Sequence, residues 1–251
     1  MQNDQKTATI KESLKTFNKQ FDRVFVTGDI HGDVFDLEAR VAKIGDATKD
    51  DLLIILGDIA FFYSLFHNDA AKDTARRAYA ANLPITLLCV QGNHEQPFCE
   101  MDAERIKLLG GDGYERDGIY FASNGTTLDI NGNSCLVVGG AYSVDKPWRL
   151  LRGNAWWQNE ELTDAELLDI QAATKGKRFD FVLTHTCPFN FLPREMFLAE
   201  IDQSRVENRT EKALQMIHDS IKFGKWFCGH FHTDKFDGKI EFFYKGIKQI
   251  I

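Results

Sequence analysis

RVFVTGDIHG, at residues 23–32, is the stretch from which the rest of the expected architecture follows. A short run rich in Val and Phe stops at a glycine, and a carboxylate and an imidazole come next. This order predicts a buried strand that carries ligand side chains at its carboxyl end. Asp29 and His31 are two residues apart, and side chains at that spacing on extended backbone face the same side. Both can therefore bind one cation.

Two later apolar runs end in a similar way. Residues 51–56 are followed by Gly-Asp, and residues 85–90 lead to Gly-Asn-His-Glu. Between the three runs, apolar residues at helical spacing predict one helix that ends at Gly45 and another over residues 70–81. Strands and helices that alternate in this order predict a parallel sheet with helices packed on it.

The chain changes character near Gly110. Residues 119–140 contain short strands broken by Asn-Gly at 124–125 and 131–132, which is typical of antiparallel hairpins. We interpret residues 141–158 as a loop. The later elements that we expect are a helix capped by Thr163 and Glu166, a strand over 179–183, a helix over 206–221, a strand over 225–228 and a hairpin that turns at Asp237-Gly238.

The length and composition bound the domain organisation. The chain has 251 residues and 43% hydrophobic content, which is enough for a sizeable core. We predict one domain over residues 1–251, with residues 1–22 as a packed but peripheral arm that carries Leu14, Phe17 and Phe21 at helix-like spacing. No apolar run reaches the roughly 18 residues that span a bilayer, and no signal peptide is recognisable. We therefore expect a soluble, cytoplasmic protein.

Cysteines and charge exclude several kinds of function. The five cysteines are an odd number without a C-x-x-C pair, and Cys89, Cys135 and Cys228 lie in apolar runs. Buried, reduced thiols are expected, and not a disulfide framework or a zinc knuckle. The net charge of −7 argues against sequence-independent binding of long nucleic acid. It is compatible with a small phosphorylated ligand at a local positive site.

Side chains with metal-ligating atoms gather at five expected strand ends. They are Asp29 and His31, Asp58, Asn93 with His94, His185, and His230 with His232. The carboxyl ends of strands in open α/β sheets converge on one crevice, so these groups can meet. The other two histidines, His67 and His218, fall in expected helices, and we interpret them as ordinary surface or packing residues.

Taken singly, these residues have ordinary structural interpretations. Asp29 or Asp58 could cap a helix, and Asn93 could form a turn. Such roles do not explain why ligand groups recur after glycine at strand ends. Oxygen and nitrogen ligands without thiolate suit Mn, Fe or Zn. Seven candidates, with His94 set aside, exceed one tetrahedral site and fit two divalent metals that share a bridging carboxylate.

The motifs GDIHG, GDIA, GNHE, TH and GHFH, in this order from Gly28 to His232, resemble those of the calcineurin-like metallophosphoesterases. The resemblance implies an α/β fold of two mixed β-sheets packed face to face between helices, a four-layer α/β/β/α sandwich with a dinuclear site at the strand ends. The implied ligand sets are Asp29, His31 and His232 for one metal, and Asn93, His185 and His230 for the other, with Asp58 as the bridge.

The implied activity is metal-dependent hydrolysis of phosphate mono- or diesters. Two cations about 3.5 to 4 Å apart lower the pKa of a shared water toward 7, and the resulting hydroxide would attack phosphorus in line. His94 is placed by the resemblance beside the phosphate, where it would protonate the leaving oxygen. No covalent enzyme intermediate is expected.

One departure separates this chain from the Ser/Thr protein phosphatase branch of the family. That branch has Asp and Arg three and four residues beyond its bridging Asp, where one orients the catalytic His and the other binds phosphate. Here those positions hold Phe61 and Phe62. The chain therefore does not resemble that branch, and the orienting partner of His94 stays unassigned.

Residues 139–149, GGAYSVDKPWR, are the best candidate for positioning the substrate. Tyr142 supplies a phenol and Lys146 an ammonium group, while the guanidinium of Arg149 suits a phosphate. The tryptophans at 156–157 could stack on a base, or alternatively cover the core, with both cations solvated. We expect a phosphorylated small molecule or nucleotide as substrate and no membrane partner, and the oligomeric state stays open.

Two other functions compete with hydrolysis. A non-catalytic metal-binding or scaffold protein could retain the fold, but such relatives typically lose ligands or the catalytic His, and every matched position is filled here. In a mononuclear or structural metal protein, Asp58 would be superfluous. The phosphate-loop, dinucleotide-binding, serine-hydrolase and H-E-x-x-H motifs of other enzyme classes are absent.

Overall fold

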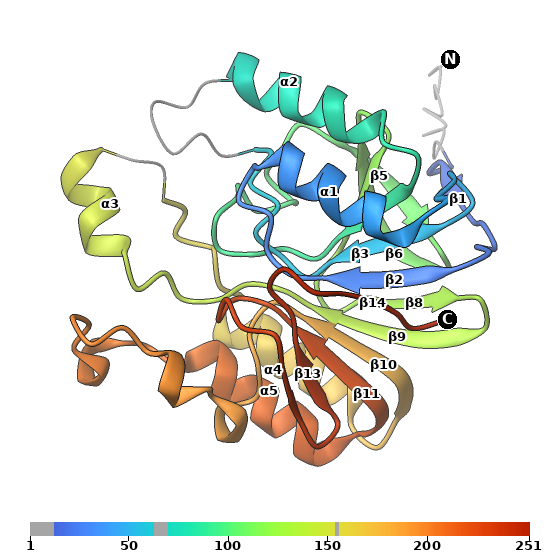
Figure 1. Cartoon of the computed structure of the whole chain (residues 1–251). Helices are drawn as coiled ribbons and strands as arrows, with labels where there is room; N and C mark the ends of the chain where they lie inside the picture. Colours follow the sequence, from blue (N-terminus) through green and yellow to red (C-terminus); the bar gives the residue numbers. More distant parts are fainter. Residues whose placement is uncertain (1–12, 63–69, 154–155) are drawn as a thin grey trace, which may run out of the picture.

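Two β-sheets lie face to face, with helices on both outer sides (Figure 1). The computed structural model describes residues 13–62, 70–153 and 156–251. Within these ranges the first sheet has eight strands, in the order β1 (Thr16–Phe17), β5 (Glu104–Leu108), β6 (Gly111–Arg116), β7 (Ile119–Ala122), β4 (Thr86–Cys89), β3 (Leu52–Ile55), β2 (Val24–Thr27) and β14 (Ile247–Gln249). The second has six, in the order β12 (Lys235–Asp237), β13 (Ile240–Phe242), β11 (Lys222–Cys228), β10 (Arg178–Thr184), β9 (Asn133–Val138) and β8 (Thr127–Ile130).

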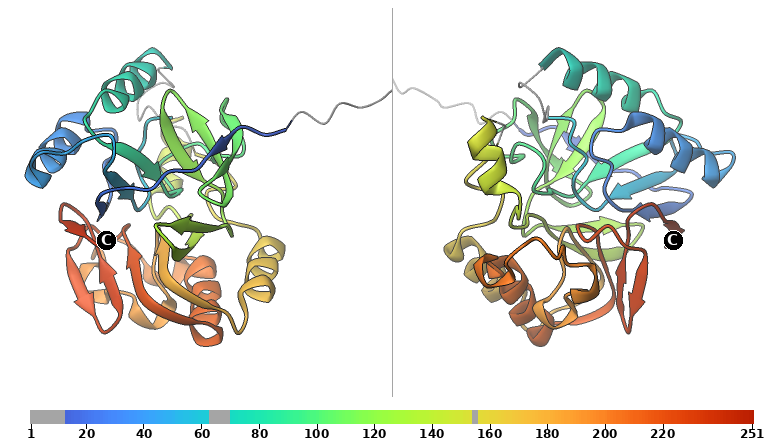
Figure 2. Two further views of the ribbon diagram at one scale, coloured as in Figure 1. Left: turned by 90° about the vertical axis from the view of Figure 1, so that its right-hand side faces the viewer. Right: turned by 60° about the vertical axis from the view of Figure 1, so that its left-hand side comes forward.

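The helices form the two outer layers. Helices α1 (Val34–Ile44) and α2 (Ala70–Ala81) cover the first sheet, and α4 (Asp164–Thr174) and α5 (Arg209–Ser220) cover the second. Figure 2 shows the two halves stacked in both further views. The short elements α3 (Lys146–Arg152), η1 (Phe189–Phe191), η2 (Arg194–Met196) and η3 (Gln203–Arg205) lie on the left of Figure 1. These layers confirm the four-layer α/β/β/α sandwich.

Successive residues of the central strands pack into different layers, because side chains of a strand alternate between its two faces. In β2, Val24 and Val26 join an apolar core between the sheets that also contains Leu183 of β10. Phe25, between them, packs in a second core with Leu37 of α1. A strand covered on both faces is apolar throughout, which explains why the run before Gly28 shows no polar alternation.

The strand and helix pattern expected for the first half is confirmed. Strands β2, β3 and β4 are parallel neighbours. Helix α1 begins at Asp33, whose carboxylate accepts two backbone N–H groups of the first turn, and it ends at Gly45. In the second half, the capping box of Thr163 and Glu166 starts α4 as expected.

The prediction of a hairpin at Asn124-Gly125 is wrong. Strand β7 before it pairs with β4 and β6 in the first sheet, whereas β8 after it pairs with β9 in the second. The dipeptide therefore carries the chain from one sheet to the other. Ile170 of α4 lies 2.7 Å from where a Cβ at Gly125 would be, so this glycine serves close packing. Asn131-Gly132 does join β8 and β9 in a hairpin.

The loop expected over residues 141–158 contains a helix. Asp145 precedes α3, Pro147 lies in its first turn, and Gly153 ends it with φ at 65°. Proline at the start and glycine after the end of a helix are the usual boundary residues. The prediction of a loop throughout residues 141–158 is therefore wrong, because Pro147 and Gly153 mark the two ends of a helix.

Residues 13–22, the described part of the predicted N-terminal arm, are extended and do not follow their helix-like spacing. β1 pairs with β5 at the edge of the first sheet. Phe21 is buried in the core between the sheets, while Leu14 is exposed. The single-domain division stays a prediction. Among the described residues, no helix has both the length and the apolar character that crossing a membrane requires.

Candidate metal centre

The seven predicted ligand residues follow five strands whose ends meet at one place. β2, β3 and β4 are parallel neighbours in the first sheet, as are β10 and β11 in the second. Their carboxyl ends therefore point the same way within each sheet. Three groups of side chains, with ligand atoms within 4.8 Å of one another, result: Asp29, His31 and His232; His31, Asp58 and His94; and Asp58, His185 and His230.

The first group surrounds a carboxylate oxygen that lacks a hydrogen-bond donor. Asp29 Oδ1 accepts the backbone N–H of His230 at 2.9 Å, but the buried Oδ2 has no hydrogen-bond partner. Two imidazole nitrogens face that oxygen, His232 Nε2 at 3.2 Å and His31 Nε2 at 3.6 Å, and they lie 2.8 Å apart. Burial raises the pKa of Asp29, but the two histidines outweigh it and the net shift is downward. An ionised carboxylate oxygen with two imidazole nitrogens close to it is a suitable set of ligands for a divalent cation.

In the group of Asp58, His185 and His230, a backbone carbonyl orients the imidazole of His185. His185 Nδ1 lies 2.8 Å from the carbonyl of Leu56, and a carbonyl only accepts, so Nδ1 carries the proton. His185 Nε2 then faces Asn93 Oδ1 at 2.9 Å and Asp58 Oδ1 at 3.4 Å. Burial lowers the pKa of His185, yet the Asp58 carboxylate raises it to about 10. The environment of Nε2 therefore favours a positive charge, and a metal cation could take the place of the proton at Nε2.

Asp58 is in the group with His31 and His94 and in the group with His185 and His230, and His31 links it to the group around Asp29. Its Oδ1 accepts the backbone N–H groups of Asn93 and His94, both at 2.8 Å. Its Oδ2 lies 3.9 Å from His31 Nδ1 and 4.0 Å from His94 Nε2. One carboxylate thus belongs to two of the three groups, so the residues present fit a pair of cations.

The backbone at the site is in an unusual conformation. His31, Asp58, His230 and His232 have φ of 51°, 51°, 69° and 50°. Such left-handed residues are uncommon apart from glycine, although Asp, Asn and His are enriched among them. They cluster at functional sites, where the surrounding structure holds them.

The motif glycines leave room for ligands that come from other strands. A Cβ at Gly57 would lie 2.1 Å from His185 Nδ1, and one at Gly92 would lie 2.1 Å from Asp58 Oδ1. Each glycine therefore permits a ligand of a different motif to approach. This explains why glycine precedes ligand residues at separate strand ends.

The side chain of Arg149 contacts the ring of His94. Its Nη2 lies 2.7 Å from His94 Nε2 and 3.0 Å from Nδ1, and Nη1 donates to the carbonyl of Asn93 at 3.2 Å. Nε donates to Asp145 at 2.9 Å. The side chain has no exposed surface, so its role in binding substrate stays a prediction. Burial is the main cause that lowers the pKa of His94 to about 4, and Arg149 adds to it.

Sequence reasoning did not find the residues that support the ligands. Asn93 Nδ2 donates to Ser143 Oγ at 2.9 Å, and Ser143 donates to Glu160 at 2.6 Å, which turns the oxygen of Asn93 toward His185. The buried Arg40 donates to the carbonyls of Gly28 and Asp29. A signal for this arginine exists, because it lies on the apolar face of α1.

Glu95 was within the quoted GNHE motif but had no role assigned. It is fully buried and accepts the backbone N–H of Gly92 at 2.5 Å and of Ala60 at 3.1 Å. Burial raises its pKa to about 7. It therefore ties the loop after β4 to the loop after β3.

Of the other residues singled out in the sequence, one lines a cavity beside the candidate metal centre and the rest lie elsewhere. Tyr142 lines the cavity that opens beside Asp58, Asn93 and His94. The described lining of that cavity does not include the tryptophans at 156–157, and Lys146 Nζ lies 4.1 Å from the ring centroid of Trp156. Phe61 and Phe62 belong to the core beneath the first sheet. His218 packs on Phe191 and Trp226, whereas His67 lies outside the described residues.

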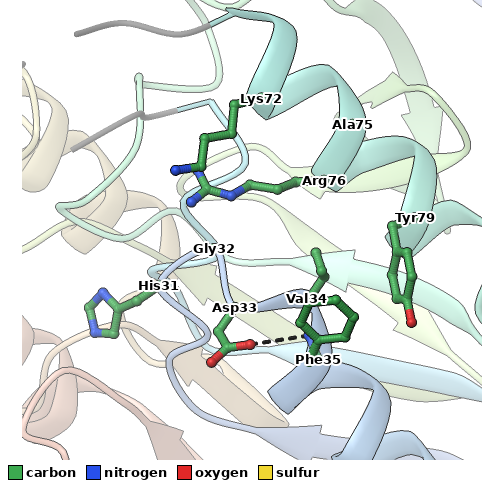
Figure 3. Close-up of a pocket in the computed structure, with 9 residues that line it drawn as sticks. All are labelled: His31, Gly32, Asp33, Val34, Phe35, Lys72, Ala75, Arg76 and Tyr79. Carbon is green, nitrogen blue, oxygen red and sulfur yellow. Dashed lines mark hydrogen bonds between the residues drawn. The ribbon is translucent and has the colours of Figure 1, made fainter. Parts of the chain in front are cut away.

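A second hollow, of about 520 Å³, has His31 in its lining (Figure 3). Lys72 and Arg76 line it from α2, and Phe35 and Tyr79 line it from α1 and α2. Figure 3 shows Arg76 reaching toward Gly32, next to Lys72. The lining thus contains two cationic side chains together with the Asp33 carboxylate, and Arg76 is ion-paired with Asp73 at 3.2 Å.

A sequence model of the family described as calcineurin-like phosphoesterase matches residues 22–234. The matched region contains all seven predicted ligands and His94. A search of curated proteins finds no match.

Proposed function

The chain belongs to the calcineurin-like phosphoesterase family, and on that premise we propose that it hydrolyses phosphate mono- or diesters with two divalent metal ions. The observation that carries the proposal is the overlap of the ligand groups at Asp58, beside a buried Asp29 oxygen without a hydrogen-bond partner. A structural ion would need one such group, whereas two groups that share a carboxylate suit phosphoryl chemistry.

In this proposal the ligand sets are those expected from the resemblance. Asp29, His31 and His232 would hold one ion, Asn93, His185 and His230 would hold the other, and Asp58 would contact both. The ions, when bound, supply a hydroxide nucleophile near neutral pH and positive charge for the phosphoryl oxygens. Mn, Fe and Zn all suit this donor set.

His94 acts on the leaving group. Its pKa of about 4 keeps the ring neutral near pH 7, and a neutral imidazole still carries one N–H. Arg149 Nη2 can only donate and lies nearest to Nε2, so Nε2 accepts and the ring N–H is assigned to Nδ1. In this proposal that N–H donates to the leaving oxygen as negative charge develops there. Arg149 fixes the ring through its contacts and fills the role of the orienting partner that the sequence left unassigned.

The substrate in this proposal is a phosphorylated small molecule or nucleotide, and the protein acts in the cytoplasm without a membrane partner. Reduced cysteines support that compartment, since four of the five are buried and all are free. The competing function, a non-catalytic scaffold, is disfavoured because the ligand positions and His94 are all filled.

Hydrolysis and metal content test the proposal together. Purified protein loaded with Mn²⁺, Fe²⁺ or Zn²⁺ is expected to hold about two ions per chain by elemental analysis. It is expected to release nitrophenol from p-nitrophenyl phosphate or its bis-ester, and chelation should abolish this release. Two bound ions without turnover of either ester would favour the scaffold function instead.

A further inference from the structure

We propose that the leaving group of the substrate is bulky, apolar and uncharged, and that it binds in the cavity next to His94. This inference rests on the proposed hydrolase function and names the substrate class. The cavity measures about 420 Å³, within the roughly 300–1,000 Å³ of small-molecule sites. It is continuous with the candidate metal centre, since Asp58, Asn93 and His94 form part of its wall.

The opposite wall is apolar. It comes from the segment between β10 and α5, which contains η2 and η3. Its lining side chains include Leu192, Met196, Phe197, Leu198, Ile201 and Val206. Met196 is 41% exposed and Leu198 is 59% exposed, although both face a hollow. Removing apolar surface from water is favourable in free energy, and a ligand in the cavity would cover these side chains.

The charged residues of this cavity are acidic. Asp145, Glu207 and Glu211 line it, and no Lys or Arg is among its described lining residues. Asp145 is ion-paired with Arg149 at 2.9 Å, and burial raises the pKa of Glu211 to about 7, so Glu207 is the lining carboxylate that would chiefly repel an anion. A leaving group with a further phosphate or a carboxylate would be repelled.

The position of His94 decides which part of the ester enters the cavity. His94, the proposed donor to the leaving oxygen, lines this cavity and does not line the hollow of Lys72 and Arg76 shown in Figure 3. The leaving group therefore lies on the apolar side of the metal centre.

Esters that differ only in apolar size test this inference. We would assay the metal-loaded protein with 4-methyl-, 4-butyl- and 4-hexylphenyl phosphate, whose alkyl groups scarcely change the acidity of the phenol. The expected kcat/KM rises about twofold to fourfold for each buried methylene. In a second pair, a 4-carboxyethylphenyl ester should be hydrolysed at least about tenfold more slowly than its amide. Calorimetric binding of the free 4-alkylphenols provides a readout independent of turnover.

A matched pair of variants locates the effect. Leu198→Glu adds a charge to the cavity wall and should flatten the dependence on alkyl length in both assays. Leu151→Glu, at an 85% exposed position of α3, should leave the dependence unchanged. Turnover and phenol binding without any dependence on alkyl length would overturn this inference alone. Absence of turnover with every ester, at full metal content, would overturn the proposed function instead.

Discussion

The two ligand groups of the metal centre differ in their access to solvent. In the group around Asp29, the side chains of His31 and His232 are 27% and 48% exposed. In the group around Asp58, His185 is fully buried and its Nδ1 is held by the carbonyl of Leu56. If the proposed pair of ions is bound, water would reach the first position more readily than the second. We infer that the two ions would exchange at different rates, and the following substitutions test this difference.

The largest effect is expected from Asp58, the residue that is proposed to contact both ions. Asp58→Asn removes one negative charge between both positions and should lower turnover by about 10³-fold or more. Elemental analysis should show fewer than two ions per chain, and circular dichroism should show an intact fold. Turnover like that of the unchanged protein would mean that the groups act separately.

His94 should affect turnover without affecting metal binding. His94→Ala removes the donor to the leaving oxygen, which is expected to cost about 10²-fold in kcat. The metal content should stay at that of the unchanged protein, since no metal ligand is lost. A variant that loses an ion would show that His94 is a ligand in the group with His31 and Asp58.

His185 and His232 provide a direct comparison of the buried and the exposed position. His185→Ala leaves a cavity and an unpaired Leu56 carbonyl, so the metal-free variant should lose about 2–3 kcal/mol of unfolding free energy. His232→Ala should cost less than about 1 kcal/mol, because its side chain is half exposed. Urea unfolding of both metal-free variants measures the difference. Equal losses would show that burial does not distinguish the two positions.

The smallest effect is expected from Ser143, which contacts the candidate ligand Asn93. Ser143→Ala removes the acceptor that turns the amide of Asn93, and should weaken binding of one ion about tenfold. Ser204→Ala, at an exposed serine of η3, is the control. Competition with a chelator measures the affinity. An unchanged affinity in Ser143→Ala would mean that Asn93 is held by other contacts.

The gathering of the candidate ligand residues at one place could be predicted because their signal is local. An apolar run, a glycine and a polar side chain lie within a few residues of one another at Asp29 and Asp58, and the chemistry of the donor set is visible in the residue types. The sheet of β2, β3 and β4 followed from the same runs.

Contacts between distant residues could not be predicted in this way. Arg149 and His94 are 55 residues apart, and only the fold brings the guanidinium to the ring. Two Asn-Gly pairs have the same local preference, yet Asn131-Gly132 closes a hairpin while Asn124-Gly125 connects two sheets. The packing of Ile170 against Gly125 decides the second case, and that contact is absent from the local sequence.

The left-handed backbone at His31, Asp58, His230 and His232 restricts how this centre could be re-engineered. Glycine, Asn and Asp tolerate that conformation, whereas Val, Ile and Thr resist it. Exchanging a ligand for Asn or Asp would thus change donor chemistry while keeping the loop shape. A β-branched replacement would alter both, so its effect on metal selectivity could not be read separately from the distortion of the loop.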